Sequence, residues 1–233
     1  MQNNIFLESE GDNWNLRYEK NYSSRISPSR KLLTKWCEPI KKDINKILEI
    51  GSGNGLGLYY ISNNIQAKAN GIEPSKEGIN LWKKKYSNDF ENSHIVTLQK
   101  GTSESLPYED DSFDLVIFGF CLYLVDRNLL FKSISEADRV LRDGGYLAIE
   151  DFDPSKIMMN KYRHYEGINS YKTNYSKIFL ASDHYALMHK YSYSEGVSND
   201  LNFNFNKDMN NRVSLSLLYK QENSIYENFD NSI

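Results

Sequence analysis

The stretch LEIGSGNGLG, residues 48–57, decides the fold. Its first three residues and the preceding Ile47 form a short, mainly apolar run, which predicts a buried strand over residues 47–50. The glycines that follow let the backbone adopt positive φ angles and approach a ligand closely. A helical pattern over residues 58–65 comes directly behind them, so the free N–H groups and the positive dipole end of that helix face the turn. Ligands of open α/β sheets bind at such a turn.

The rest of the chain repeats the order of strand and helix, which is typical of a parallel sheet. Apolar runs predict four more strands, at residues 69–73, 95–98, 114–118 and 146–150. Two final strands have no helix between them and are predicted at residues 185–193 and 212–219. We therefore predict an α/β fold, with a Rossmann-like seven-stranded, mostly parallel sheet, helices on both faces and a C-terminal antiparallel hairpin.

Capping residues mark several of the predicted helices. Ser27 and Pro28 form an N-cap and first helical position in front of a pattern that reaches Ile40. Asp126 is predicted to cap a later helix, and the pair Gly144-Gly145 is predicted to end it. Residues 1–26 are polar, and we expect them to be irregular.

Composition and charge exclude several classes of protein. The chain has 233 residues and 28 basic against 31 acidic side chains, a net charge of -3 that does not suit a general nucleic-acid binder. Two cysteines are too few for a disulfide scaffold or a four-thiolate zinc site. Residues 115–125, the longest near-apolar run, are about half of the ~20 residues that span a bilayer. With no signal-peptide pattern at the N-terminus, we expect a cytoplasmic protein with no membrane partner.

The acidic residue behind the second strand narrows the ligand. Glu73 ends that strand, where a carboxylate can accept both hydrogen bonds of a ribose diol. A nicotinamide-binding G-x-G-x-x-G motif would need glycine at Leu56 or Leu58, so the register of the glycines disfavours an oxidoreductase. No phosphate-binding G-x-x-x-x-G-K-[ST] loop is present either. A glycine-rich turn without a ligand is the alternative.

Four stretches in order resemble the motifs of class I S-adenosylmethionine-dependent methyltransferases. They are LEIGSGNGLG (48–57), GIEPS (71–75), GTSESLPYEDDSFDLVIFGFCLYLVD (101–126) and LRDGGYLAIEDF (141–152). The resemblance covers about residues 45–155 and implies S-adenosyl-L-methionine as the cofactor. It also implies one domain over residues 1–233, with a helical segment (1–43) over the cofactor and an acceptor-side insertion (152–182).

The resemblance places the cofactor among residues of the glycine turn, the ends of the following strands and the N-terminal segment. These residues are Tyr22, Gly51, Ser52, Gly53, Gly55, Glu73, Pro74, Thr102, Ser103, Glu104, Gly119 and Phe120.

Residues behind the fourth strand set some methyltransferase subclasses aside. The sequence there reads GFCL (119–122) in place of the Asp/Asn-Pro-Pro-aromatic motif of amino-methylating nucleic-acid enzymes. Cys121 is expected to be a small buried residue, not a nucleophile. Asp126, Asp151 and Asp153 could form an acidic cluster, but we predict no metal site.

The insertion interleaves basic residues and tyrosines, and it resembles a segment of methyltransferases encoded among surface-polysaccharide biosynthesis functions. Because Arg and Lys recognise phosphate and carboxylate, we predict O-methylation of a small anionic acceptor, a phosphorylated or nucleotide-linked sugar or a phosphoryl headgroup precursor. His164 is the candidate general base. The candidate acceptor-binding residues are Tyr123, Arg163, Ser170, Tyr171, Lys172 and Tyr175.

Other interpretations of the same residues remain open. His164 can be a solvated or structural histidine, and the basic residues can belong to an exposed surface. The chain can also be a non-catalytic module that binds S-adenosylmethionine or a partner. A quinone or lipid methyltransferase would need a broad apolar acceptor pocket, which the polar insertion disfavours. We expect a monomer or homodimer.

Overall fold

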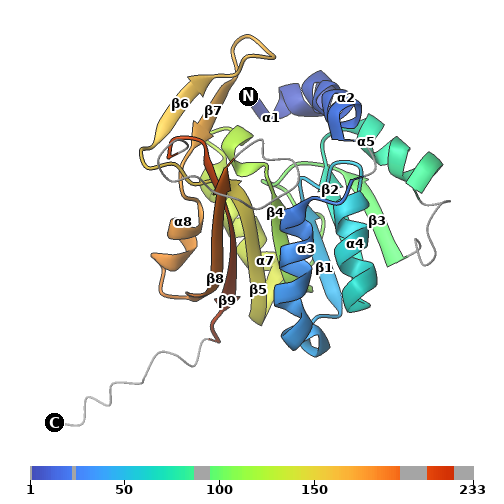
Figure 1. The fold of residues 1–233 in the computed structure, drawn as a ribbon, viewed down its shortest axis with the longest axis vertical. Coiled ribbons are helices and arrows are strands. Elements are labelled where there is room, and N and C mark those ends of the chain that lie inside the picture. The colour runs from blue at the N-terminus through green and yellow to red at the C-terminus, as the bar shows by residue number, and fades with distance from the viewer. Residues whose placement is uncertain (1, 23–24, 87–94, 195–208, 223–233) are drawn as a thin grey trace.

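The computed structural model describes residues 2–22, 25–86, 95–194 and 209–222. In this part of the chain seven strands form one sheet in the order β3-β2-β1-β4-β5-β9-β8, and β6 and β7 form a separate antiparallel pair (Figure 1). The strands are β1 (Lys46–Ile50), β2 (Lys68–Glu73), β3 (Val96–Lys100), β4 (Phe113–Gly119), β5 (Leu141–Phe152), β6 (Met158–Lys161), β7 (Asn169–Lys172), β8 (Tyr185–Ser194) and β9 (Arg212–Lys220).

The first five strands of the large sheet run parallel, and the last two run antiparallel. β1 pairs in parallel with β2 and β4, β2 with β3, and β4 with β5. β9 is antiparallel to both β5 and β8. The predicted seven-stranded, mostly parallel sheet with a C-terminal antiparallel hairpin is confirmed.

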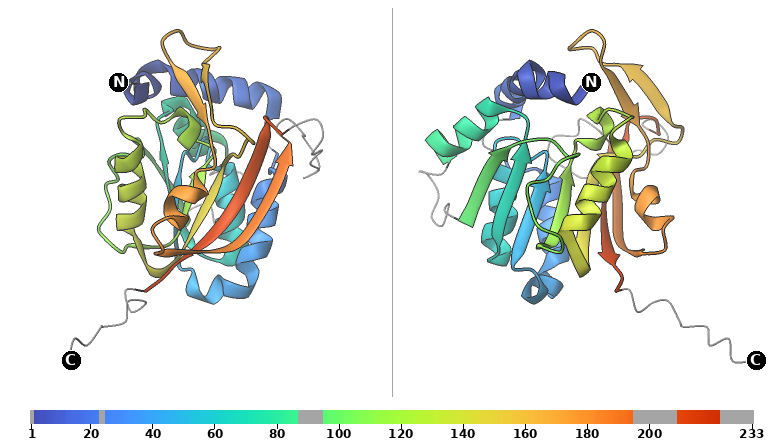
Figure 2. Two further views of the ribbon diagram at one scale, coloured as in Figure 1. Left: turned by 90° about the vertical axis from the view of Figure 1, so that its left-hand side faces the viewer. Right: turned by 180° about the vertical axis from the view of Figure 1, so that it is seen from behind.

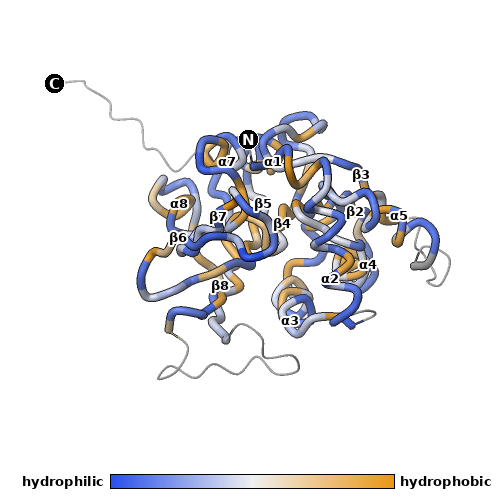
Figure 3. Tube along the Cα trace, turned by 90° about the horizontal axis from the view of Figure 1, so that it is seen from above, coloured by the Kyte–Doolittle hydropathy of each residue, from blue (hydrophilic) through white to orange (hydrophobic). Residues whose placement is uncertain are grey.

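Helices cover both faces of the sheet because its central strands are apolar on both sides. In β4, Leu115 and Ile117 pack into the cluster that holds α3, α4 and α5, whereas Val116 and Phe118 pack into the cluster that holds α7 and α8. Seen from above, apolar and hydrophilic residues alternate along the flanking helices (Figure 3). The helices are α3 (Pro28–Cys37), α4 (Leu56–Ile65), α5 (Lys76–Leu81), α7 (Leu130–Val140) and α8 (Ser176–Leu180).

Residues at the N-terminus are helical, so the expectation of an irregular segment is wrong. α1 (Gln2–Ile5), a π-helix (Phe6–Glu10) and α2 (Gly11–Tyr22) follow one another without a break. Contacts with the rest of the fold hold them in place: Asp12 accepts hydrogen bonds from the Ser75 hydroxyl at 2.8 Å and from the Glu77 N–H at 2.9 Å. We call these three helices, residues 2–22, the roof, because they lie over the carboxyl ends of the strands (Figure 1).

Two predicted helix ends differ from the structure. Ser27 caps α3 as predicted, accepting a hydrogen bond from the Arg30 N–H. Asp126 does not cap α7, which begins at Leu130 behind Leu129; its carboxylate accepts hydrogen bonds from the backbone N–H groups of Gln2 and Asn128 instead. Gly144 does not end that helix but lies within β5, where its φ of 69° accompanies a shift in register against β4.

The insertion after β5 folds as a hairpin beside the roof. β6 and β7 project from the body of the molecule next to the N-terminal helices, and α8 follows them (Figures 1 and 2). We call residues 156–172 the hairpin. Across the described residues, no helix has both the length and the apolar character needed to cross a membrane.

Replacement of a leucine inside the sheet tests this packing. Leu217 of β9 is 0% exposed, whereas Leu187 of the neighbouring β8 is 47% exposed. Leu217→Ala is expected to lower the free energy of unfolding by about 2–5 kcal/mol, because it removes buried contacts and leaves a cavity. Leu187→Ala is expected to stay within about 0.5 kcal/mol of the original chain. Urea denaturation followed by circular dichroism measures both, and equal effects would contradict the sheet order.

Candidate functional site

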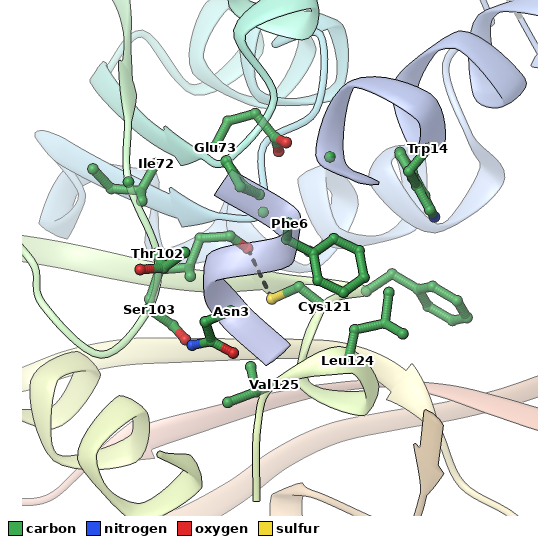
Figure 4. A pocket seen from close by; sticks show the side chains of 17 residues that line it. Asn3, Phe6, Trp14, Ile72, Glu73, Thr102, Ser103, Cys121, Leu124 and Val125 are labelled. Atoms are coloured by element: carbon green, nitrogen blue, oxygen red, sulfur yellow. Dashed lines mark hydrogen bonds between the residues drawn. The ribbon is translucent and has the colours of Figure 1, made fainter. Parts of the chain in front are cut away.

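A cleft lies at the carboxyl ends of β1, β2 and β4, beneath the roof. Two pockets form it and share four residues of their lining, Trp14, Gly51, Gly119 and Phe120. The first pocket has a volume of about 680 Å³, which includes its opening to solvent, and it extends toward Glu73 and Thr102 (Figure 4). The second has a volume of about 760 Å³, measured in the same way, and extends toward Tyr18 of α2 and Arg30 of α3. The shared lining makes them two ends of one cleft.

The glycine turn after β1 forms the inner wall where the pockets meet. Gly51, Gly53 and Gly55 have φ angles of 78°, 57° and 76°, in the left-handed region that favours glycine. A Cβ on Gly51 would lie 2.8 Å from that of Cys121, so this glycine also admits a close neighbour. Gly51 lines both pockets, and Gly53 and Ser52 line the second. Gly55 lines neither; it is the N-cap of α4 and packs against Trp82.

Glu73 and Pro74 line the first pocket at the end of β2. The Glu73 carboxylate is buried and accepts hydrogen bonds from the N–H groups of Gly53 at 2.7 Å and Ser75 at 2.9 Å. Burial raises the pKa of Glu73 to about 7, although the two backbone hydrogen bonds oppose the shift. A carboxylate is thus fixed at the edge of the glycine turn, as the sequence predicts.

The segment after β3 forms the far wall of the first pocket. Thr102 and Ser103 line it, and the Ser103 hydroxyl is 2.7 Å from that of Ser133. Glu104 does not line the pocket. Its carboxylate accepts hydrogen bonds from the Thr102 hydroxyl at 2.8 Å and from the side-chain amide of Asn3 at 2.6 Å, which anchors the roof.

Phe120 stands where the two pockets meet, at the end of β4. Its φ of 54° is unusual for a bulky residue and is fixed by a hydrogen bond from its N–H to the Glu150 carbonyl at 2.9 Å. Its ring lies 5.2 Å from the Tyr123 ring and 5.0 Å from the Phe152 ring, centroid to centroid. Tyr123 is buried behind Phe120 and lines neither pocket.

A buried ion triad forms the floor of the second pocket. The guanidinium of Arg30 on α3 pairs with Glu49 of β1 and with Glu150 of β5, the latter at 2.7 Å. Burial lowers the pKa of Arg30, but the two carboxylates raise it above its ordinary range. The Tyr193 hydroxyl donates to Glu150 at 2.5 Å. Within the described residues, Glu49 Oε2 and the Ser52 hydroxyl, which both belong to residues of the pocket lining, are buried without a hydrogen-bond partner.

The roof presents one stripe of side chains to the cleft. Phe6, Glu10, Trp14 and Tyr18 recur at a spacing of four residues, which places them on one helical face. Phe6 and Trp14 line the first pocket, and Trp14 and Tyr18, stacked with centroids 5.3 Å apart, line the second. The side chain of Tyr22 lies outside the described residues.

The comparisons with known proteins agree with this geometry. Residues 48–149 match the model of a family described as a methyltransferase domain. The match covers less than half of the chain. The matched residues run from β1 to β5 and include the glycine turn, Glu73, Thr102 and Phe120. The prediction of an S-adenosylmethionine-dependent methyltransferase of class I is confirmed at the level of this domain, but the comparisons do not show an association with surface-polysaccharide biosynthesis.

Relatives of the methyltransferase domain cover only part of the chain. Phthiotriol/phenolphthiotriol dimycocerosates methyltransferase 1 of Mycobacterium ulcerans is 32% identical over 111 residues, which are 47% of this chain and 38% of that enzyme. The uncharacterized methyltransferase YcgJ of Bacillus subtilis is 30% identical over 121 residues, 51% of this chain and 45% of that protein. The chain therefore spans less than half the length of these curated relatives.

Solved structures share the fold over most of the chain. The 1,6-didemethyltoxoflavin-N1-methyltransferase of Burkholderia thailandensis has a TM-score of 0.68 and 10% identity, covering 94% of this chain and 89% of that one. The structure of YcgJ has a TM-score of 0.61 and 17% identity, covering 83% of this chain and 98% of that one. At these identities the likeness shows the fold alone.

Residues predicted to bind an anionic acceptor lie outside both pockets of the cleft. His164 is exposed at the tip of the hairpin, where it accepts a hydrogen bond from Arg163 Nε at 3.1 Å. Lys172 Nζ lies 3.8 Å from the centre of the Phe152 ring, and the Ser170 hydroxyl contacts the Asn160 carbonyl at 3.5 Å. In this arrangement the predicted anion ligands form no common pocket.

Two of the predicted acceptor residues hold an arginine in place instead. The Arg127 guanidinium lies 4.3 Å from the centre of the Tyr171 ring and donates to the Tyr175 hydroxyl at 3.1 Å. The same guanidinium donates to the carbonyls of Leu122 and Val125, at 2.6 Å and 2.8 Å. The two tyrosines therefore stabilise the turn that carries Val125 into the first pocket.

The acidic residues behind β4 and β5 are occupied by protein donors. Asp151 accepts hydrogen bonds from the N–H groups of Tyr123 and Phe152, and burial raises its pKa to about 8. Asp153 pairs with Lys190 at 2.9 Å. Among the described residues, no group of three or more His, Cys, Asp or Glu side chains could hold a metal ion.

Removal of the buried guanidinium tests the floor of the cleft. Arg30→Met is expected to lower the free energy of unfolding by about 3–5 kcal/mol, because Glu49 and Glu150 are left buried without a positive partner. The deficit is expected to shrink as the pH falls, since protonation of Glu49, whose pKa burial already raises, removes the uncompensated charge.

Urea denaturation at several pH values measures this deficit. Arg163→Met, on the exposed hairpin, is the matched control and is expected to change stability by less than about 0.5 kcal/mol. A pH-independent loss in Arg30→Met would contradict the assignment of charge.

Proposed function

We propose that the chain transfers a methyl group from S-adenosylmethionine to a small acceptor with an apolar, flat body. The observation that carries the acceptor class is the aromatic lining of the cleft: Trp14 and Phe120 line both pockets, and Phe6 lines the first. The basic residues of the hairpin, which favoured an anionic sugar, do not reach this space. The proposal for the acceptor therefore rests on the cleft itself.

The residues of the cleft fit the cofactor. Glu73 is placed to accept hydrogen bonds from the ribose hydroxyls, and Thr102 and Ser103 to line the adenine. The buried, unpartnered Glu49 Oε2 offers an acceptor for the ammonium group of the methionine moiety. A Cβ at Gly53 would meet no atom within 4 Å, so the glycine turn leaves space for the methionine moiety.

The bound cofactor supplies a methyl group already activated on a sulfonium. The chain positions that group and its acceptor, an effect worth up to roughly 7–11 kcal/mol of barrier. Phe120 presents its ring at the junction of the pockets, where an aromatic face attracts a positive sulfonium. The roof covers the cleft and excludes water from the reacting atoms.

The names of related proteins support an acceptor without a sugar phosphate. The Mycobacterium ulcerans relative is named for phthiotriol and phenolphthiotriol dimycocerosates. The Burkholderia thailandensis structure contains 1,6-didemethyltoxoflavin and S-adenosylhomocysteine. Both support the use of apolar and heteroaromatic compounds as the first acceptors to test.

Ionisation of Glu73 is expected to control cofactor affinity. Its pKa of about 7 means that the carboxylate, which accepts two hydroxyl hydrogen bonds, forms as the pH rises through neutrality. Affinity for S-adenosylhomocysteine should therefore increase by up to about tenfold from pH 6 to pH 8. Glu73→Gln should bind about tenfold or more weakly and lose this pH dependence.

Isothermal titration calorimetry measures the affinity of both forms. Glu77→Gln, nearby on α5 and exposed, is the control and should retain both the affinity and its pH dependence. Equal binding by the Glu73 variant would contradict the ribose assignment.

Turnover with radiolabelled S-adenosylmethionine tests the acceptor class. Hydroxylated and amino-substituted aromatic compounds are expected to be methylated, and nucleotide sugars are not. Trp14→Ala and Phe120→Ala should each lower kcat/KM by about tenfold or more, since each removes an aromatic face from the cleft. Phe131→Ala, an exposed aromatic residue on α7, is the matched control.

Two outcomes would overturn this proposal. Turnover of nucleotide sugars that is lost in His164→Ala or Lys172→Ala would favour the anionic acceptor. Cofactor binding without turnover on any acceptor of the panel would favour a non-catalytic module.

A further inference from the structure

The hairpin exposes large apolar side chains to solvent. Ile157 is 84% exposed, more than any other large apolar side chain in the described residues, and Met159 is 67% exposed. Tyr165, at the tip, is 39% exposed. By contrast Ile168 of the same hairpin is buried in the core. The hairpin is therefore held to the body by residues other than Ile157 and Met159.

These exposed residues lie on one side of the outer strand. Ile157, Met159 and Lys161 are two residues apart, so their side chains leave the extended chain in the same direction. The partner strand β7 lies against the body, where Ser170 is buried and Tyr171 packs on Arg127. The hairpin thus has an inner strand that packs and an outer strand that faces away.

The charges beside these apolar residues are mainly positive. Lys156, Lys161 and Arg163 are exposed, and Glu166 is the single acidic residue between positions 155 and 167. The segment therefore carries a net charge of +2 (three basic minus one acidic), although the whole chain carries -3. None of the three basic residues forms a salt bridge within the described residues, so their charges face solvent.

Hydrogen bonds fix the hairpin to the roof of the cleft. The Tyr162 hydroxyl donates to the buried Glu10 carboxylate at 3.0 Å and accepts from Arg17 at 3.0 Å. At the other end of the hairpin, the Asn169 N–H donates to the side-chain carbonyl of Gln2 at 3.2 Å. The outer strand β6 therefore projects beside the roof (Figures 1 and 2).

We propose that the hairpin docks the protein on an anionic lipid surface. Apolar side chains enter the boundary between headgroups and acyl chains, and lysine and arginine are attracted to anionic headgroups. Ile157 and Met159 supply the first interaction, and Lys156, Lys161 and Arg163 supply the second. The contact is peripheral and brings the cleft next to a surface that can hold an apolar acceptor. Docking itself requires neither cofactor nor turnover, so it stands apart from the proposed function.

Co-sedimentation with vesicles tests the docking surface. The full chain is mixed with vesicles of equal parts phosphatidylglycerol and phosphatidylcholine, or of phosphatidylcholine alone, without cofactor. It should pellet with the anionic vesicles and bind less as salt is added, because salt screens the lysine and arginine charges. Lys161→Glu with Arg163→Glu should lower the partition coefficient by about tenfold or more. Ile157→Ser with Met159→Ser should lower it by a similar factor.

The control is a second exposed apolar residue next to a lysine. Phe131 is 74% exposed on α7 and precedes Lys132, so Phe131→Ser changes apolar exposure away from the hairpin. It should bind vesicles like the original chain, and circular dichroism should show every variant folded. The proposal is wrong if no vesicle is bound, if the hairpin variants bind like the original chain, or if Phe131→Ser weakens binding equally. Size-exclusion chromatography gives one more contrary outcome. The proposal is also wrong if the original chain forms a dimer in place of binding vesicles, and the Ile157→Ser, Met159→Ser variant is a monomer.

Discussion

The ion triad of Arg30, Glu49 and Glu150 is the constraint on which the cleft depends. It joins α3 and β1 to β5, which follows about 100 residues later in the chain, and it lines the second pocket together with the glycine turn. A buried guanidinium needs compensating charge, and two buried carboxylates need a positive partner, so none of the three can be exchanged alone. Space for the triad comes from Gly119, where a Cβ would lie 2.6 Å from Glu49 Oε1. The triad uses one oxygen of Glu49 and leaves the other unpartnered. The same group therefore supports the fold and offers an acceptor to a ligand.

The upper side of the cleft depends on shorter-range polar contacts. The Glu104 carboxylate accepts a hydrogen bond from Asn3, and Asp12 accepts one from Ser75, the N-cap of α5. The Glu10 carboxylate accepts hydrogen bonds from Arg17 and Tyr162. Floor and roof thus differ in kind: the floor is a buried charge cluster between α3 and the sheet, whereas separate side-chain hydrogen bonds and the Arg17–Glu10 ion pair hold the roof.

Local patterns in the sequence predicted most of the sheet and the inner half of the site. Three features can each be recognised from a few consecutive residues: the apolar run that contains Leu115 to Phe118, the glycine turn, and Glu73 at the end of a strand. Arg30 could not be predicted in this way, because its partners come from strands that only the fold brings together. The roof is helical through tertiary contacts, so its polar sequence looked irregular. The tyrosines and lysines of the insertion were assigned to an acceptor by composition, and composition does not show which way a hairpin faces. Gly144 resembled a helix end because a glycine with positive φ serves a β-bulge equally well.

The backbone conformation of Phe120 affects which residues selection would favour at this position. A bulky residue with a φ of 54° stores strain, of order 1–3 kcal/mol, that glycine would release. The ring at the junction of the pockets would be lost with it. Under the proposed function, stability and catalysis therefore oppose each other at this position, and a library selected only for thermal tolerance would drift toward glycine there. Selection for turnover would keep the phenylalanine, so the residue recovered at position 120 reports which of the two pressures acted.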